Sequence, residues 1–383
     1  MGTENSKLAI LSSIPLFPEK YGGSLRTCNL ARLADIFFPK VSIFSKTLGV
    51  LGTEGTKQLG NISIIQTADS KNSSNKYITH FTRILSRGTT QNIPWEKRMI
   101  LDHDIIQLES PYFYDFIRMK KNKYILDQHN IYWELEAESK FTGNKAYNNL
   151  IYKFNKKKEI DAIKNASHVL VTSDTDKKKI LEYIPFIGDK ITVIPNCVNL
   201  NTKKNPHKRN SDKKTVLFIG LLHYYPNADA ARMICEHIAP RFNEDVEFII
   251  IGKGNFYGTY PKNVKFLGYI KDIQPFLSSA DICIAPLRFG SGTRLKILEY
   301  MAACKPVIST SKGAEGIEYV DKENIIIEDN INNFVGIIKE LLNEENRACE
   351  IGKSAEKLIK QKYEWNLYSN TLNDVYKIVL NDI

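Results

Sequence analysis

Short apolar runs alternate with longer amphipathic segments along the whole chain. The apolar runs are rich in Val and Ile, which is typical of parallel strands that are buried on both faces. In the first half, strands are expected at 8–13, 41–45, 62–66, 105–109, 124–128, 168–173 and 191–195. In the second half, they are expected at 215–220, 246–252, 264–268, 282–286, 307–310 and 325–327. Strands that alternate with helices predict right-handed βαβ crossovers, and therefore an α/β protein with doubly wound sheets.

One polar segment interrupts this alternation. Residues 201–214 contain a proline and no large apolar side chain, so they predict a linker between two domains. We expect Rossmann-like domains at 1–200 and 215–364, and helical periodicity in the final segment, 365–383. Doubly wound sheets bind ligands at the carboxyl ends of their strands, so a cleft between the two domains is the expected place for a ligand.

The segment from Gly290 to Glu299 holds the clearest candidate site. Small residues join an expected strand to an expected helix, and they leave backbone N–H groups free at a helix start, where anions bind. These small residues are Gly290, Ser291, Gly292 and Thr293. Arg294 and Lys296 follow in the first helical turn, where a cation is unfavourable unless an anion is bound nearby. Glu299 shares a side of the helix with Lys296 and could accept hydrogen bonds from sugar hydroxyls.

Charge and composition narrow the class of protein. The net charge of the 383 residues is +10, and residues 1–200 carry 28 basic against 20 acidic side chains, so the first domain is the one expected to meet an anionic surface or substrate. No apolar run approaches the ~18 residues of a membrane span, and the N-terminus lacks a secretory pattern. The six cysteines form no CxxC pair and the seven histidines lack metal-ligand spacing. We therefore expect a cytoplasmic protein without a metal.

Four stretches, taken in order, resemble the retaining glycosyltransferases of family 4. They are VIPNCV at 193–198, FIGLLHYYPN at 218–227, FIIIGKG at 248–254 with FLGYI at 266–270, and GSGTRLKILE at 290–299 with KPVISTSKGAEG at 305–316. The resemblance covers nearly the whole chain and implies the GT-B fold, in which two Rossmann-like domains face each other across a cleft. It also implies that the C-terminal helix returns to the N-terminal domain, that the first domain binds the acceptor, and that the second binds the nucleotide sugar.

The resemblance also implies roles for single residues. Gly22 and Gly23 match the glycine loop of the first domain, whose backbone approaches the donor phosphates or the acceptor. His129 matches a histidine that meets the donor sugar, and His223 is expected to line the cleft. Ile270 would contact the base through its backbone. Arg26, just after the glycine loop, is either an anion contact or a surface side chain.

Two positions depart from the family pattern. Ser291 stands where the family commonly has a glutamate that contacts the donor sugar, and Leu221 stands where it has an arginine. Arg294 and Lys296 could supply the missing positive charge from the helix. We therefore expect Arg294, Lys296 and His129 to carry catalysis, and the remaining candidate residues to hold the donor.

The expected activity is transfer of a hexose from a nucleoside-diphosphate sugar to an acceptor hydroxyl with retention of configuration. The sugar nucleotide is a co-substrate, and no cofactor, metal or nucleic acid is expected. The acceptor is a glycan or a lipid-linked molecule. Lysine runs at 156–158 and 177–179 are either solvated helix faces or points of peripheral contact with the inner, anionic face of a membrane. The alternatives are a nucleotide-sugar epimerase or inverting GT-B transferase, a basic nucleic-acid-binding protein, and a degenerate transferase that binds nucleotide without turnover.

Overall fold

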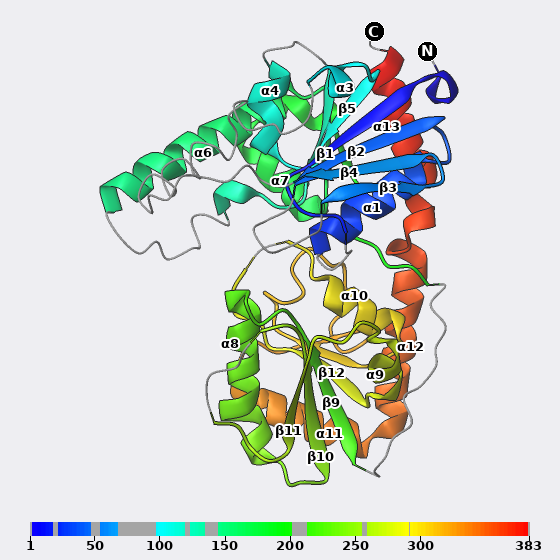
Figure 1. Ribbon diagram of the computed structural model, residues 1–383. Coiled ribbons are helices and arrows are strands. Elements are labelled where there is room, and N and C mark those ends of the chain that lie inside the picture. The colour runs from blue at the N-terminus through cyan, green and yellow to red at the C-terminus, as the bar shows by residue number, and fades with distance from the viewer. Residues whose placement is uncertain are drawn as a thin grey trace. The chain divides into compact units, whose positions relative to one another are not determined.

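The chain forms two compact units, one made of Met1–Pro195 with Trp365–Ile383 and one made of Asn196–Glu364. The computed structural model describes residues 2–17, 22–46, 54–67, 97–118, 123–134, 145–200, 213–254, 259–290 and 292–381 (Figure 1). Most of the expected linker, 201–212, therefore lies outside the described residues.

The first unit is built on an eight-stranded sheet with the strand order β3-β4-β2-β1-β5-β6-β7-β8. Its strands are β1 (Lys7–Ser12), β2 (Lys40–Lys46), β3 (Gly55–Leu59), β4 (Ile62–Thr67), β5 (Ile105–Leu108), β6 (Tyr124–Gln128), β7 (His168–Val171) and β8 (Ile191–Val193). Its α-helices are α1 (Gly22–Ala34), α3 (Lys97–Leu101), α4 (Tyr114–Arg118), α6 (Lys145–Asn165), α7 (Asp174–Tyr183) and α13 (Ser369–Asn381). All strand pairs are parallel except β3 with β4. The apolar pattern did not predict β3, and this strand adds one antiparallel pair at the edge of the sheet.

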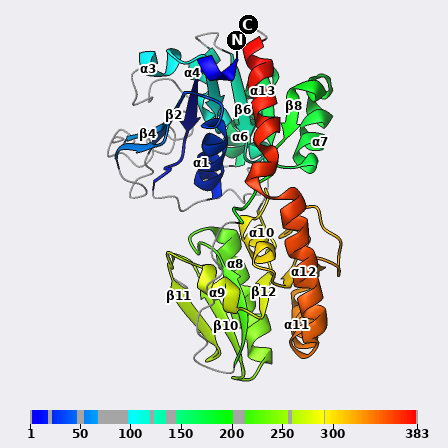
Figure 2. The same ribbon diagram turned by 90° about the vertical axis from the view of Figure 1, so that its right-hand side faces the viewer.

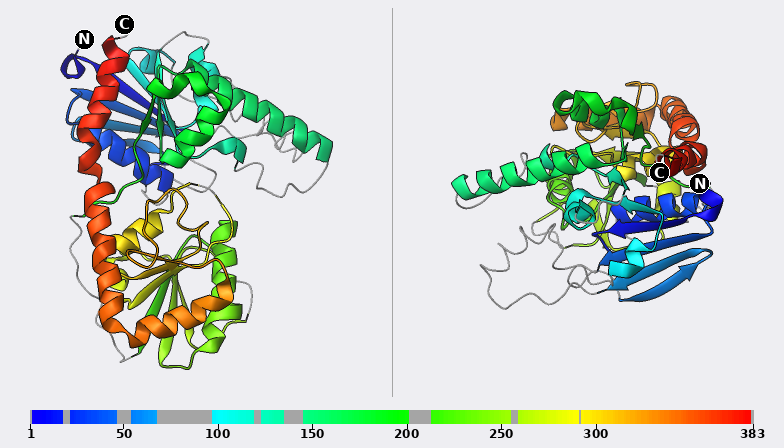
Figure 3. Two further views of the ribbon diagram at one scale, coloured as in Figure 1. Left: turned by 180° about the vertical axis from the view of Figure 1, so that it is seen from behind. Right: turned by 90° about the horizontal axis from the view of Figure 1, so that it is seen from above.

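Alternate side chains of these strands enter two different layers. In β5 and β6, Ile106, Leu108, Tyr124 and Leu126 belong to the buried apolar cluster that includes side chains of α4, α6 and α7. The intervening positions face the other layer, where Gln107 accepts a hydrogen bond from Tyr376 of α13 at 2.8 Å. The chain's C-terminal helix thus belongs to the first unit, as the expected fold requires, and it runs along this unit in Figures 2 and 3.

The second unit is built on a six-stranded parallel sheet with the order β11-β10-β9-β12-β13-β14. Its strands are β9 (Lys214–Ile219), β10 (Val246–Ile251), β11 (Val264–Gly268), β12 (Ile282–Ala285), β13 (Val307–Ser309) and β14 (Ile326–Ile327). Its α-helices are α8 (Tyr225–Met233), α9 (Gln274–Ser279), α10 (Leu295–Ala302), α11 (Phe334–Asn343) and α12 (Glu345–Lys362). The strand order reverses between β9 and β12, and this switch point is where doubly wound sheets bind ligands.

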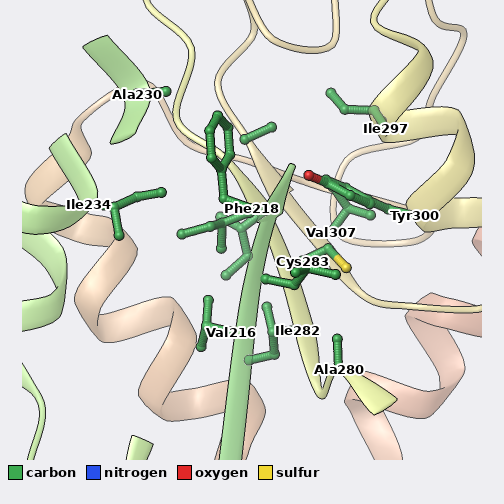
Figure 4. Packing of buried hydrophobic residues seen from close by; sticks show 14 of the residues in the cluster. Val216, Phe218, Ala230, Ile234, Ala280, Ile282, Cys283, Ile297, Tyr300 and Val307 are labelled. Carbon is green, nitrogen blue, oxygen red and sulfur yellow. The ribbon is translucent and has the colours of Figure 1, made fainter. Parts of the chain in front are cut away.

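The core of the second unit lies around β9 and β12. Val216, Phe218, Ile282 and Cys283 are all buried there, and Figure 4 shows them between α8 on one side and α10 on the other. This burial on both faces explains why the strands read as continuous apolar runs in the sequence. Ile297 and Tyr300 of α10 belong to the same buried cluster, so α10 packs beside these strands.

Candidate functional site

Three glycines end neighbouring strands of the second unit. Gly220 follows β9, Gly252 follows β10, and Gly268 ends β11 with a φ of +65°. The amide of Gly252 donates to the carbonyl of Gly268 at 2.8 Å. A Cβ on Gly252 would lie 1.8 Å from the carbonyl oxygen of Gly220. The backbones at Gly220 and Gly252 therefore approach more closely than a side chain at position 252 permits.

The predicted glycine turn lies between β12 and α10. Gly290 and Gly292 have φ values of +98° and +80°, which only glycine adopts without strain. A Cβ on Gly290 would lie 2.9 Å from both the Nη2 atom of Arg294 and the hydroxyl of Tyr224. The Oγ1 atom of Thr293 is buried, and it has no hydrogen-bond partner among the described residues. Ser291 lies outside the described residues.

Arg294 is the residue that precedes α10, and its guanidinium turns back over the turn. Its Nη1 atom donates to the carbonyl of Gly292 at 2.9 Å, and its Nη2 atom donates to that of Phe289 at 3.5 Å. The predicted position of Arg294 inside the first helical turn is thus corrected by one residue, because α10 begins at Leu295. The guanidinium remains at the helix start, next to the glycine turn.

Two side chains of α10 reach the end of β9. The hydroxyl of Tyr300 accepts a hydrogen bond from the amide of Ile219 at 2.7 Å, and the ring of Tyr300 lies beside β9 in Figure 4. The ammonium of Lys296 donates to the Oδ1 atom of Asn227 at 2.6 Å. It also lies 4.4 Å from the ring centroid of Phe218. Helix spacing places residues 296 and 300 on one face, so α10 directs Lys296 toward the loop that follows β9.

Asn227 fixes the place of that ammonium. Its Nδ2 atom donates to the carbonyl of Leu221 at 3.0 Å, which leaves Oδ1 to face Lys296. A Cβ on Gly220 would lie 2.8 Å from the Nζ atom of Lys296. Lys296 thus places a positive charge beside Gly220, next to position 221, where the resemblance predicts an arginine and this chain has Leu221.

Burial acts on both charged groups of α10. It lowers the pKa of Lys296 to about 7, with a further lowering by the nearby Arg294 and an opposing effect of Glu299. Burial raises the pKa of Glu299 to about 7, and the ammonium of Lys296 partly opposes this rise. An anion at the glycine turn would favour the charged form of Lys296. The predicted pairing of Lys296 and Glu299 on one side of the helix agrees with their mutual electrostatic effect.

Two further predicted residues lie on loops of the second unit. His223 is exposed and follows β9 by four positions, and its amide nitrogen would lie 3.1 Å from a Cβ on Gly254. Ile270 is partly buried against the core of the unit, two residues after Gly268. The structure thus brings the Gly290–Glu299 segment and the strand-end loops into one unit, and these roles stay predictions.

The first unit brings the other predicted residues together. A Cβ on Gly23, in the first turn of α1, would lie 3.3 Å from the Nδ1 atom of His129 and 2.5 Å from Ile14. The Nε2 atom of His129 lies 3.1 Å from both a carboxylate oxygen of Glu109 and one of Asp127. Gly22 is the first residue of α1. The glycine loop and His129 therefore form one structural group.

Arg26 is part of this group and is not a surface side chain. It is 1% exposed, and it pairs with both carboxylate oxygens of Asp127 at 2.7 and 2.8 Å. Its Nη1 atom donates to the carbonyl of Ile194 at 2.8 Å. Glu109, Asp127 and Asn227 were not expected from the sequence. Glu109 and Asp127 could have been predicted from the sequence, because each is a lone carboxylate at the end of an apolar strand. A carboxylate buried there needs a hydrogen-bonded or charged partner.

Glu109, Asp127 and His129 have one ligand atom each within 4.8 Å of one another, which raises the question of a metal. Arg26 already occupies both oxygens of Asp127, and the Nε2 atom of His129 faces both carboxylates. In this cluster the two carboxylates are balanced by Arg26 and His129. Their oxygen atoms already have hydrogen-bond partners, so the arrangement is less suited to a metal ion. The absence of a metal requirement stays a prediction.

Comparison with known proteins supports the resemblance of the second unit to glycosyltransferases. Residues 213–344 match the family model described as "Glycosyl transferases group 1". This match covers most of the second unit, Asn196–Glu364. No curated protein sequence matches the chain.

Solved glycosyltransferases share the fold of the whole chain. Sucrose-phosphate synthase from Thermosynechococcus elongatus is similar with a TM-score of 0.74 and 14% identity, over 99% of this chain and 100% of that one. HepE from Anabaena, solved with UDP-glucose, has a TM-score of 0.66 and 11% identity, over 97% and 99%. WaaG, a glycosyltransferase of lipopolysaccharide biosynthesis, has a TM-score of 0.67 and 12% identity, over 96% and 99%. The predicted GT-B fold is confirmed.

Proposed function

We propose that the chain is a retaining, family 4 glycosyltransferase that moves a hexose from a nucleoside-diphosphate sugar to an acceptor hydroxyl. The observation that carries this proposal is the position of Lys296. Its ammonium is held beside the carboxyl end of β9 by a neutral amide, within a group 1 glycosyltransferase domain. A partly buried cation that has no carboxylate in hydrogen-bond contact among the described residues favours a bound anion. UDP and UDP-glucose, which the similar protein HepE binds, supply such an anion and are the first candidates.

The residues at and near the glycine turn then have distinct roles. Arg294, Lys296 and the amides of the glycine turn stabilise the charge that develops on the leaving diphosphate. Glu299 accepts hydrogen bonds from the ribose, and the backbone near Ile270 contacts the base. The bond from the anomeric carbon to the diphosphate oxygen breaks, and a bond to the acceptor oxygen forms on the same face. The acceptor proton passes to the leaving phosphate oxygen, so no cofactor, metal or covalent protein intermediate is required.

Nucleotide binding provides the first test. A thermal-shift screen of UDP, GDP, ADP and their sugars should find one base that raises the melting temperature, and calorimetry should then give its affinity. Lys296→Ala should weaken that affinity at least tenfold without unfolding the protein. Lys353→Ala, at an exposed position of α12, is the matched control and should leave the affinity unchanged. An unchanged affinity in Lys296→Ala would contradict the site assignment.

The product separates the proposal from its alternatives. An α-linked product from an α-linked donor supports retention, whereas a β-linked or epimerised product favours an inverting transferase or an epimerase. Binding of the nucleotide without donor hydrolysis or transfer above background would indicate a degenerate transferase. Salt-sensitive RNA or DNA binding, with no response to any nucleotide of the screen, would favour a nucleic-acid-binding protein.

For the acceptor, we propose a lipid-linked glycan that is reached by peripheral contact of the first unit with an anionic membrane. Three aromatic side chains are unusually exposed there: Phe154 of α6 (55%), Tyr183 at the end of α7 (50%) and Phe186 just after it (75%). The ammonium of Lys156 lies 4.1 Å from the centroid of Tyr183, which places this lysine of α6 beside one of the exposed rings. No helix among the described residues is long and apolar enough to cross a membrane.

Vesicle sedimentation tests this contact. The protein should bind vesicles that contain about one third anionic lipid and should be released by salt, because lysines near the surface contribute about 1 kcal/mol each. Phe186→Ser should reduce binding several-fold, whereas Val320→Ser, at an exposed apolar position of the second unit, should not. Equal binding to neutral vesicles, or equal loss in both variants, would argue against the proposed surface.

A further inference from the structure

The imidazole of His129 has two different environments on its two nitrogen atoms. Nε2 lies 3.1 Å from Oε2 of Glu109 and 3.1 Å from Oδ2 of Asp127. Nδ1 faces the first turn of α1, where a Cβ on Gly23 would lie 3.3 Å away. The side chain of His129 is 11% exposed, while both carboxylates are buried. Only the Nδ1 side of the ring therefore remains available to a ligand.

The two carboxylates differ in how their charge is balanced. Asp127 has a bidentate partner in Arg26. Glu109 accepts hydrogen bonds from neutral donors, namely the hydroxyl of Thr27 at 2.6 Å and the amide of Gln107 at 2.7 Å. Among the described residues, the only cationic partner of Glu109 is His129. A buried carboxylate with neutral donors alone is costly, so Glu109 favours a positive charge on the ring.

We propose that Glu109 is a positioning residue: it accepts a hydrogen bond from Nε2–H of His129 and helps to keep the ring charged, so that Nδ1–H is the donor that His129 presents to a ligand oxygen at the Gly22–Gly23 turn. This rests on the proposed function insofar as the ligand is an oxygen of the donor sugar. Gly23 is required because any larger residue would fill the space in front of Nδ1. A neutral ring with its proton on Nε2 would instead present Nδ1 as an acceptor. It would then bind the hydrogen of the sugar hydroxyl and not its oxygen.

The electrostatic surroundings agree with this geometry. Burial alone would lower the pKa of His129, but Asp127 and then Glu109 raise it to about 9. Among the described residues, Tyr132 and Tyr376 are the other titratable groups near the two carboxylates, and burial raises the pKa of both phenols well above the usual range. They stay neutral near pH 7, so the two carboxylates and Arg26 determine the charge of the ring.

Nitrogen-15 NMR of the histidine-labelled full chain tests the proposal directly, with His129→Gln used to assign the signals. In the unaltered protein, both nitrogens of His129 should have imidazolium shifts at pH 7 and should titrate near pH 9. In Glu109→Gln, the midpoint should fall by about 1 to 3 pH units, the usual effect of removing an adjacent opposite charge. Glu182→Gln, the same change at an exposed position of α7, should leave the midpoint in place.

Two results would overturn the proposal: a neutral His129 ring at pH 7 in the unaltered protein, or an unchanged midpoint in Glu109→Gln. The first measurement does not need Glu109→Gln, so it decides the matter even if that variant does not fold. Turnover of UDP-glucose, measured in the same preparation, separates the positioning role of Glu109 from the proposed transferase activity. A shifted midpoint with no turnover of any nucleotide sugar would leave the positioning role intact and contradict the transferase. Turnover with a neutral ring would contradict only the positioning role.

Discussion

At the scale of single residues, Lys296 shows how a binding group can oppose stability. Its folded pKa of about 7 lies below that of a free lysine, so the unfolded chain binds more protons between about pH 7 and pH 10.5. Stability from this group therefore increases as the pH rises through that interval. The ammonium is retained at a position where a neutral side chain would fit better, which is the pattern of a functional residue.

Lys296→Met is accordingly expected to stabilise the protein while it abolishes nucleotide binding. The expected gain in the free energy of unfolding at pH 7 is about 1 to 3 kcal/mol, after allowance for the partial exposure of the side chain. The gain should shrink toward pH 10, where the unfolded lysine also loses its proton. Urea denaturation at pH 7 and pH 10 measures both values. A loss of stability at pH 7 would show that the ammonium is well solvated in the folded protein.

Glu299 allows a test of ribose recognition with a matched pair of ligands. If its carboxylate accepts a hydrogen bond from the ribose, the unaltered protein should prefer UDP over 2′-deoxy-UDP by about tenfold, since a hydrogen bond to a charged group contributes ~1.5 kcal/mol or more. Glu299→Gln should bind UDP more weakly and should lose most of this preference. Calorimetry with both ligands gives the four affinities. An equal preference in the variant would place the ribose elsewhere.

At the scale of elements, the sequence predicted most of the two sheets because their strands are buried on both faces. β12 and residues 216–219 of β9 are continuous apolar runs, a pattern typical of strands buried on both faces. The edge strand β3 has the sequence GTKQL and an exposed surface, so no apolar pattern marks it. The sequence could not show that Arg26 meets Asp127, because the two are 101 positions apart and only the sheet brings them together. The glycine turn was found because its residues are contiguous.

The glycine that ends β10 tests how strands hold the site. In Gly252→Ala, the new Cβ would overlap the carbonyl of Gly220, so the loop after β9 must move. We expect a loss of about 2 to 4 kcal/mol of stability, comparable with overpacking in a core, and weaker nucleotide binding. Gly336→Ala in α11 meets no atom within 4 Å and should instead stabilise by about 0.5 to 1 kcal/mol. Similar unfolding curves for the two variants would contradict the close approach.

At the scale of the whole molecule, the chain leaves the first unit at Pro195 and returns to it at Trp365. The returning helix α13 buries Leu372, Val375, Tyr376, Val379 and Leu380. The ring of Tyr376 packs edge-on against Phe38, and its hydroxyl binds Gln107, which in turn binds Glu109. The last segment of the sequence thus supports the cluster around His129, which is built from the first third of the chain.

Removal of residues 369–383 should therefore unfold the first unit and leave the second folded. The five buried side chains contribute about 1.5 to 3 kcal/mol each, a sum on the order of the total stability of a domain. Hydrogen exchange should show loss of protection in peptides from β1 and β5, with protection retained in β9 and β12. Lys377→Ala, at an exposed position of α13, is the control and should leave both patterns unchanged. Protected β1 and β5 in the shortened chain would mean that the first unit folds without its last helix.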